Sequence, residues 1–299
     1  MFRLEKTRSD RIFDAVNTVL LGLILIVVLY PLLYVAGASI TDPQHIARGT
    51  FWLIPKDVTL EGYRRVFQNS DILRGYGNTL FYTFFGTFVN IALTIPAAYA
   101  LSRKDLDGAG AISLLLAFTM FFSGGMIPTY LVVRDLHLLN TRWALILPSA
   151  VSVYNLIIAR TFFQSNIPEE LREATFLDGC SYTRFFFSIV LPLSKAIVAV
   201  LVLYYAVSHW NEYFSALLYL RKRELWPLQN FLREILIVQE ISDAMMATEG
   251  ELDSYGEQVR AAELIKYAVI IVSTLPILCL YPLLQKYFMK GVMIGAIKS

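Results

Sequence analysis

One apolar stretch of the sequence, residues 196–220, carries polar and aromatic side chains whose spacing suits binding of a polar ligand. On a helix, Tyr205, His209 and Glu212 lie at positions i, i+4 and i+7 and share one face, with Asn211 beside them. Such groups offer hydrogen bonds and aromatic faces to a polar ligand, so these four residues are candidates for lining a translocation path. The alternative is that they hydrogen-bond to other helices or lie in an aromatic belt at a membrane interface.

The sequence lacks the other arrangements of residues that perform chemistry. His45, His137 and His209 fall in separate stretches, and Cys180 and Cys279 show no metal-ligand spacing. No Gly-x-x-x-x-Gly-Lys-Ser/Thr phosphate loop occurs in the sequence. We therefore expect no catalytic residue, no metal site and no cofactor bound by this chain. A membrane-embedded enzyme, which needs converging nucleophile, base or metal ligands, is disfavoured.

The composition indicates a membrane protein. Of the 299 residues, 56% are hydrophobic and 17% are charged, and the mean hydropathy is +0.54. The net charge of +2 leaves no basic field that would attract nucleic acid. A helix needs about 20 residues to cross the hydrocarbon core. Six apolar runs are long enough: residues 15–38, 79–101, 111–133, 144–163, 196–220 and 264–284.

Runs of this length and hydropathy predict helices, because backbone in lipid must satisfy its hydrogen bonds internally. The predicted fold class is an all-α, polytopic membrane protein with six transmembrane helices. Proline and glycine interrupt several runs, for example Gly124-Gly125 with Pro128, and such kinked helices either line an interior surface or are simply tolerated. The first run exceeds the apolar region of a signal peptide, about 7–15 residues, so we expect it to stay attached.

Six crossings would place both termini on the same side of the membrane. Lys and Arg divide almost evenly between the two faces, but the rule of positive cytoplasmic loops weights short loops and helix ends. The side that carries the N-terminal cations and the short turn Arg103-Lys104 is therefore predicted to be cytoplasmic. We divide the chain into residues 1–72, a transmembrane core at 73–286 and a cytoplasmic tail at 287–299.

The predicted cytoplasmic segment 165–192 carries signals for two short helices. Asn166 can cap a helix that starts near Pro168, whose missing N–H costs nothing in the first turn. We expect that helix to end near Leu177, with Gly179 in a left-handed turn and Ser181 capping a second helix. Two short helices joined in this way make a compact knob.

The same segment contains a spaced motif. Glu173-Ala174-Thr175 is followed by Gly179, six residues after the glutamate, by Ile189 ten residues later, and by Leu191-Pro192. This spacing resembles the cytoplasmic coupling loop of bacterial ABC-importer permeases, which ATPase subunits grip. The alternative is an ordinary amphipathic loop. Thr175 departs from the alanine common in the family but is also small. The resemblance implies these coupling residues: Glu173, Ala174, Thr175, Asp178, Gly179, Ile189, Leu191 and Pro192.

Ala174 and Thr175 are small enough to let the tip of the knob enter a groove on a partner. The carboxylates of Glu173 and Asp178 could pair with basic or amide groups there.

The resemblance covers essentially the whole chain. Residues 285–298, 53–63 and Asn78-Thr79 look like the second permease of carbohydrate-uptake ABC importers, the maltose-permease branch. Residues 123–130, 140–143 and 205–211 resemble the subgroup found with alginate, pectic and other complex oligosaccharide importers.

Membership of that family would imply a type I importer fold and a multi-pass protein of the bacterial cytoplasmic membrane. It would also imply several partners: a homologous second permease, two ATPase subunits that hold ATP and magnesium, an extracytoplasmic solute-binding protein and an oligosaccharide, acidic or complex. In the maltose system the partner permease dominates substrate contact. An ion-coupled secondary transporter, the alternative, should show an internal repeat, and it would have no use for the coupling loop.

The long outer loop, residues 221–262, has two dissimilar halves. Leu228, Phe231, Leu232, Ile235 and Val238 form one apolar stripe and predict an amphipathic helix. Residues 240–257 are acidic, and they form either a solvated loop or a docking site for the binding protein.

Overall fold

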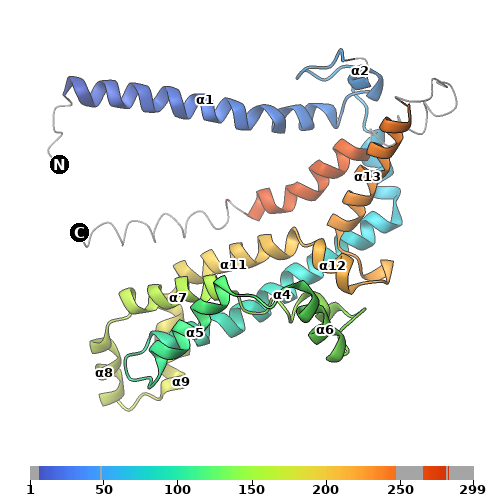
Figure 1. Cartoon of the computed structure of the whole chain (residues 1–299). Helices are drawn as coiled ribbons and strands as arrows, with labels where there is room; N and C mark the ends of the chain where they lie inside the picture. Colours follow the sequence, from blue (N-terminus) through green and yellow to red (C-terminus); the bar gives the residue numbers. More distant parts are fainter. Residues whose placement is uncertain (1–6, 48, 247–264, 281, 283–299) are drawn as a thin grey trace. The chain divides into compact units, whose positions relative to one another are not determined.

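The computed structural model describes residues 7–47, 49–246, 265–280 and 282, and all of the regular structure in these ranges is helical (Figure 1). The all-α prediction is confirmed. The predicted tail at 287–299 lies outside the described residues. The chain divides into two compact units, one formed by Met1–Asn69 with Glu234–Ser273 and the other by Ser70–Arg233 with Thr274–Ser299.

The first unit contains α1 (Arg8–Ala38), α2 (Pro43–Ala47) and α3 (Glu61–Gln68). A capping box starts α1: Thr7 Oγ1 accepts from Asp10 N–H, and the Asp10 carboxylate accepts from Thr7 N–H at 2.9 Å. The apolar side chains along most of α1 are exposed, as expected of a helix whose solvent is lipid.

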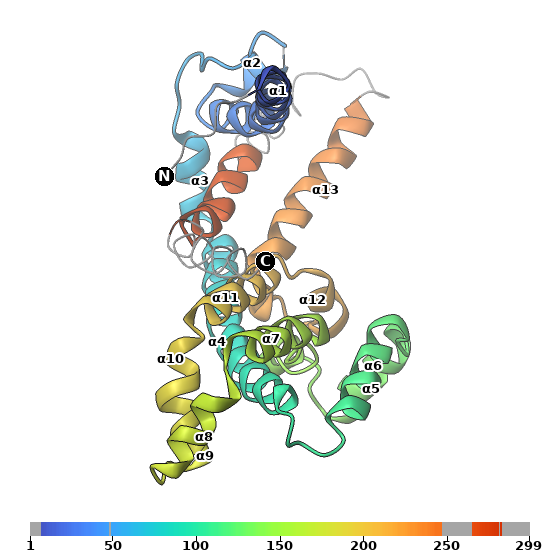
Figure 2. The ribbon, with the colours of Figure 1, turned by 90° about the vertical axis from the view of Figure 1, so that its left-hand side faces the viewer.

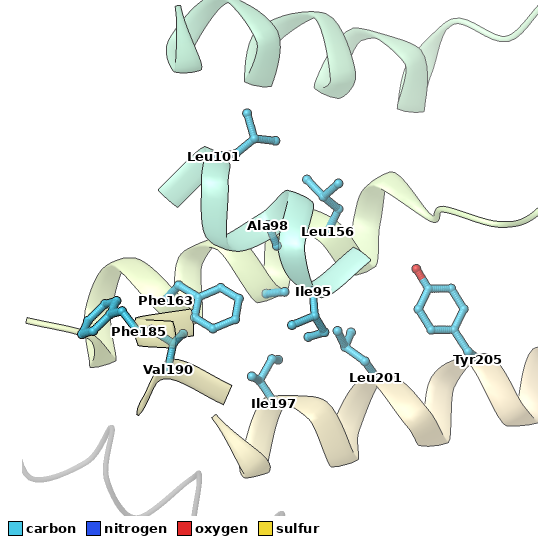
Figure 3. Packing of buried hydrophobic residues seen from close by; sticks show 11 residues of the cluster. Ile95, Ala98, Leu101, Leu156, Phe163, Phe185, Val190, Ile197, Leu201 and Tyr205 are labelled. Atoms are coloured by element: carbon cyan, nitrogen blue, oxygen red, sulfur yellow. The ribbon is translucent and has the colours of Figure 1, made fainter. Parts of the chain in front are cut away.

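The core of the second unit is built on α4 (Ser70–Ser102), which packs against α7 (Val153–Asn166) and α11 (Lys195–Trp210) (Figure 1; Figure 2). An apolar cluster lies between these helices, with Phe185 at one end and Tyr205 at the other (Figure 3). Many buried positions of α4 are small or polar rather than large and apolar. In lipid, helices associate through close packing and hydrogen bonds, which such residues provide. They include Gly75, Asn78, Thr79, Gly86, Asn90 and Thr94.

The prediction of one continuous helix over residues 111–133 is wrong. The structure has α5 (Ala109–Phe121) and α6 (Met126–Asp135), bent by 114° with respect to each other. The break falls at Gly124-Gly125, where Gly125 has φ +88° and ψ 177°, a conformation that glycine adopts without strain. The two glycines therefore end one helix and let the chain turn into the next.

Two other predicted runs are also interrupted. The 144–163 run begins in a 3-10 turn, η1 (Arg142–Leu145), and seven further residues including Pro148 precede α7. The 196–220 run comprises α11 and a separate short helix, α12 (Phe214–Tyr219).

The predicted count of six spanning helices is not confirmed. The described residues hold two helices that are long and apolar enough to cross a membrane, α1 and α4. The number rises to four if each of two bent pairs is one span, and a shorter apolar helix covers Ile265–Leu280.

Candidate functional site

The segment that carries the spaced motif folds into two short helices, as predicted. The first is α8 (Glu169–Leu177), with Glu169 and Glu170 at its positive N-terminal end. The predicted cap by Asn166 is wrong, because Asn166 is the last residue of the preceding helix α7. Its Nδ2 donates to Phe162 O at 2.9 Å, within that helix. Pro168 occupies the cap position without a side-chain hydrogen bond.

The C-terminus of α8 is closed by a Schellman motif. Cys180 N–H donates to Thr175 O at 3.1 Å and Gly179 N–H donates to Phe176 O at 3.0 Å. Gly179 has φ +77°, which confirms its predicted left-handed turn. Two carbonyls of the last turn, those of Thr175 and Phe176, therefore find their hydrogen-bond donors within the segment itself.

The second helix starts at α9 (Tyr182–Phe185), where Ser181 Oγ accepts from Arg184 N–H at 3.4 Å, as predicted. The helix continues through a π-helical turn at Phe186–Val190 and through α10 (Leu191–Leu193). A bend of 78° then leads into α11. Pro192 cannot donate a backbone hydrogen bond, and both proline and π turns are common causes of helix bends.

The residues of the motif separate into an exposed tip and a packed base. Four tip residues are exposed: Glu173, Ala174, Asp178 and Gly179. Ile189 and Leu191 instead pack against the apolar cluster of the core. Phe176 joins the two short helices, with its ring 4.6 Å from Tyr182 and 5.8 Å from Phe185. The tip is therefore presented on a base that packs against the core.

Leu177 stands out at this tip, although it is absent from the residues predicted from the motif. Its side chain is 89% exposed and lies outside the apolar spans, next to the exposed residues of the motif. It follows Ala174 by three residues and so lies near it on the helix surface. That spacing is the sequence signal that could have identified it.

A cluster of charges lies between the tip segment and the turn that follows α4. Arg103 Nε donates to Asp105 Oδ1 at 2.7 Å, and Arg172 Nη1 lies 3.6 Å from Asp105 Oδ2. Arg172 also forms an ion pair with Glu169. The hydrogen bonds from Arg103 lower the pKa of Asp105 from its ordinary value, so the carboxylate is ionised at neutral pH. The sequence contains no local signal for this long-range pairing.

Two of the four candidate translocation residues are buried between α4 and α11. His209 Nε2 lies 2.7 Å from Asn90 Oδ1, and the Tyr205 hydroxyl lies 2.8 Å from Thr94 Oγ1. Ser152 N–H also donates to the Tyr205 hydroxyl, at 3.1 Å. These polar atoms hydrogen-bond within the chain, which favours the alternative interpretation for both residues, and their role in translocation stays a prediction.

Asn90 extends this network to the non-helical segment before α7. Its Nδ2 donates to Ser149 O at 2.8 Å and to Ala150 O at 2.9 Å. Gly86 permits the arrangement, because a Cβ there would lie 2.6 Å from His209 Cε1 and 2.8 Å from Cδ2. The network thus joins α4, α11 and the start of α7.

The remaining two candidates, Asn211 and Glu212, lie beyond the end of α11. The prediction that Glu212 shares a helix face with Tyr205 and His209 is therefore wrong. Helix α11 ends at Trp210, and Glu212 Oε1 accepts from Ser215 N–H at 2.9 Å at the start of α12. Asn211 is exposed, and its Nδ2 donates to Val207 O at 3.0 Å. The helix therefore ends before the predicted face is complete.

The outer loop is fastened to the start of α4 by hydrogen bonds to its backbone. Asn78 Nδ2 donates to Glu224 O at 2.7 Å, and the Tyr82 hydroxyl donates to Leu225 O at 2.8 Å. Thr79 Oγ1 accepts from Leu228 N–H at 2.8 Å, at the first residue of α13 (Leu228–Met246).

The predicted amphipathic helix in this loop is present as α13. Leu228, Phe231 and Leu232, three residues of its predicted stripe, are buried. Residues 247–257 of the acidic half lie outside the described residues, so the docking prediction is untested.

Comparison with known proteins connects these features with transport. Residues 72–294 match the family described as "Binding-protein-dependent transport system inner membrane component". The chain is 43% identical to "Protein LplC" of Bacillus subtilis over 99% of this chain and 98% of that protein. It is 42% identical to "Polygalacturonan/rhamnogalacturonan transport system permease protein YtcP" of the same organism, over 97% of this chain and all of that one.

A solved structure is similar over nearly the full length of the chain. It is titled "Crystal structure of a bacterial ABC transporter involved in the import of the acidic polysaccharide alginate". The matching chain is 35% identical, with a TM-score of 0.83, and the match covers 95% of this chain and 99% of that one.

Proposed function

Because the chain belongs to the family of binding-protein-dependent transport system inner membrane components, we propose that it lines, with a second permease, the path of an ATP-driven oligosaccharide importer. The chain is a permease with the helical fold of type I importers. Two ATPase subunits would hold ATP and magnesium and bind at the tip formed by Glu173, Ala174 and Leu177. A solute-binding protein would deliver the substrate from outside.

The substrate that we propose is an acidic oligosaccharide derived from a polyuronate. The observation that carries this proposal is the similarity to a polygalacturonan/rhamnogalacturonan permease and to an importer of alginate, both over at least 95% of this chain. Polygalacturonan and alginate both carry a carboxylate on their sugar units.

Exposed cations beside the outer loop support an acidic substrate. Arg142, Arg221 and Lys222 are exposed, and Asn140 Oδ1 accepts from the backbone N–H groups of Arg221 at 2.6 Å and Lys222 at 3.3 Å. None of the three cations has an ion-pair partner within the described part of the chain. A cationic surface raises the local concentration of anionic ligands. In the orientation that we propose, with both termini cytoplasmic, this surface faces the binding protein.

The test is reconstitution of the complex in liposomes with its second permease, ATPase subunits and binding protein. We expect ATP hydrolysis and uptake to rise when the binding protein is loaded with oligogalacturonate or oligoalginate. A neutral trisaccharide such as raffinose should have little effect. Stimulation by the neutral sugar alone would overturn the acidic substrate, and loss of copurification with an ATPase subunit would overturn the importer assembly.

Reversing the charge of Glu173 tests the proposed role of residues 165–192, which we call the coupling segment. The variant Glu173→Lys should insert into the membrane normally but lose most substrate-stimulated ATP hydrolysis, because its exposed carboxylate is at the proposed contact. The matched control is Glu170→Lys, an exposed glutamate of the first turn of the same helix. Normal uptake by the Glu173 variant would contradict the proposed contact.

A further inference from the structure

The turn after α4 is attached to the second short helix of the coupling segment. Arg103 forms two hydrogen bonds to the Asp105 carboxylate, one of them from Nε at 2.7 Å. Its guanidinium carbon lies 5.1 Å from the ring centroid of Tyr182, the first residue of α9, and 5.9 Å from that of Tyr99 in α4. Arg103 is thereby held in one orientation by two rings and one carboxylate.

The same carboxylate also attaches the turn to the first short helix, α8. Arg172 Nη1 lies 3.6 Å from Asp105 Oδ2, and the Arg172 side chain is only 17% exposed. Arg172 is further held by its ion pair with Glu169 and by the ring of Phe176, 5.5 Å from its guanidinium carbon. We call Arg103, Asp105, Arg172 and Glu169 the charge joint.

Apolar packing holds α8 through two partly buried residues, Leu171 and Phe176, and the charge joint adds polar contacts to this packing. Within α8, which the structure describes in full, no residue is fully buried. A pocket of about 300 Å³ lies beside the joint, and its lining includes Tyr99, Phe163, Arg172 and Phe185. Helix α9 differs, because Phe185 is fully buried in the apolar cluster (Figure 3). Beyond this partial packing, the ion pair of Asp105 and Arg172 fixes α8 to the turn after α4.

We propose that Asp105 and Arg172 are positioning residues that transmit movement of α8 to α4 during transport. Their ion pair suits this purpose, because it is the contact of the charge joint that crosses from α8 to the turn after α4, so a movement of α8 must either break it or carry the turn along. Helix α4 carries Asn90 and Thr94, whose hydrogen bonds reach α11 and the segment before α7. The inference rests on the proposed function, since it assumes that an ATPase subunit moves α8.

A double-mutant cycle on the assembled transporter tests the proposal. Asp105→Ala and Arg172→Ala should each lower the substrate transported per ATP hydrolysed by about threefold or more, whereas basal ATP hydrolysis stays unchanged. The double variant should be no worse than the poorer single variant, because both changes break one interaction. Asp105→Glu, which keeps the charge, should restore part of the ratio.

The matched control is the exposed ion pair of Arg134 and Asp135, with an Arg134 Nη2 to Asp135 Oδ1 distance of 2.9 Å. Arg134→Ala should leave the ratio unchanged. If Arg172→Ala does not assemble, Asp105→Asn keeps the size of the side chain and carries the same expectation. An unchanged ratio in Asp105→Ala or Asp105→Asn, or multiplying effects in the double variant, would overturn the proposal.

The ratio is measured with whichever sugar the unmodified transporter imports. Failure of the proposed function would appear as an unmodified complex that does not transport. Failure of the charge joint would appear only in the variants, with the unmodified complex active.

Discussion

Gly86 and His209 form a close approach between α4 and α11. The His209 ring occupies the space where a side chain at position 86 would stand, and its Nε2 lies 2.7 Å from Asn90 Oδ1. Any larger residue at 86 must push the imidazole away from Asn90 or push the helices apart. Close packing and a buried hydrogen bond therefore depend on the same glycine.

We predict that Gly86→Ala destabilises the protein by about 1–3 kcal/mol, the usual cost of inserting a methyl group into a packed core. The measurement is thermal unfolding of the purified protein in detergent. Gly77→Ala, in the same helix with open space around it, is the control and should leave the unfolding midpoint nearly unchanged. Equal effects of the two substitutions would show that the contact with His209 does not cause the loss of stability.

At the level of secondary-structure elements, the ends of the helices shape the coupling segment. Helix α8 stops at its Schellman motif, the chain reverses at Gly179, and α9 begins on the Ser181 cap. The 78° bend after α10 follows Pro192, and the buried Ser194 hydroxyl at the bend has no hydrogen-bond partner within the described residues. Termination and bending, rather than helix propensity, set the direction in which the tip points.

We predict that Gly179→Ala weakens the end of α8 by about 1 kcal/mol, since a left-handed conformation costs other residues roughly 1–2 kcal/mol. Open space surrounds Gly179, so the cost comes from the backbone alone. Substrate-stimulated ATP hydrolysis should fall while expression stays normal. Gly110→Ala, within helix α5 and also in open space, is the control. Unchanged stimulation would show that the turn tolerates a side chain.

At the level of the whole molecule, orientation in the membrane decides which partners, cytoplasmic or external, each surface can bind. We propose that the segment 165–192 and both termini lie on the cytoplasmic side. Cys180 lies in that segment, half-buried and not in a disulfide, whereas Cys279 belongs to the apolar helix Ile265–Leu280. Cys180 can therefore report the side on which the segment lies.

We predict that, in a Cys279→Ser background, a membrane-impermeant maleimide modifies Cys180 in inside-out vesicles but not in intact cells. Val58→Cys, introduced after both native cysteines are replaced by serine, should show the reverse pattern. Val58 is 68% exposed in the loop after α1, on the proposed outer side. Modification of Cys180 in intact cells would reverse the proposed orientation.

The features that were predictable from sequence are local or compositional. The helical membrane class follows from long apolar runs, because a helix satisfies all backbone hydrogen bonds of a segment within lipid. Gly179 and Ser181 were assigned correctly, because turns and caps depend on a few neighbouring residues. The family followed from motifs of fixed spacing, and the matches to known proteins confirm it.

Tertiary structure decided which distant groups meet. Asp105 lies 67 positions from Arg172 in the sequence and Asn90 lies 119 from His209, and no periodicity specifies such partners. The ends of α5, α7 and α11 were also missed, because an apolar run looks the same whether its helix continues or breaks. The sequence by itself determined a helical membrane permease and, at residues 165–192, two short helices that carry a spaced motif. Only the packed structure decided that Tyr205 and His209 hydrogen-bond between segments of the chain and that α8 is tied to α4, because both depend on contacts across the chain.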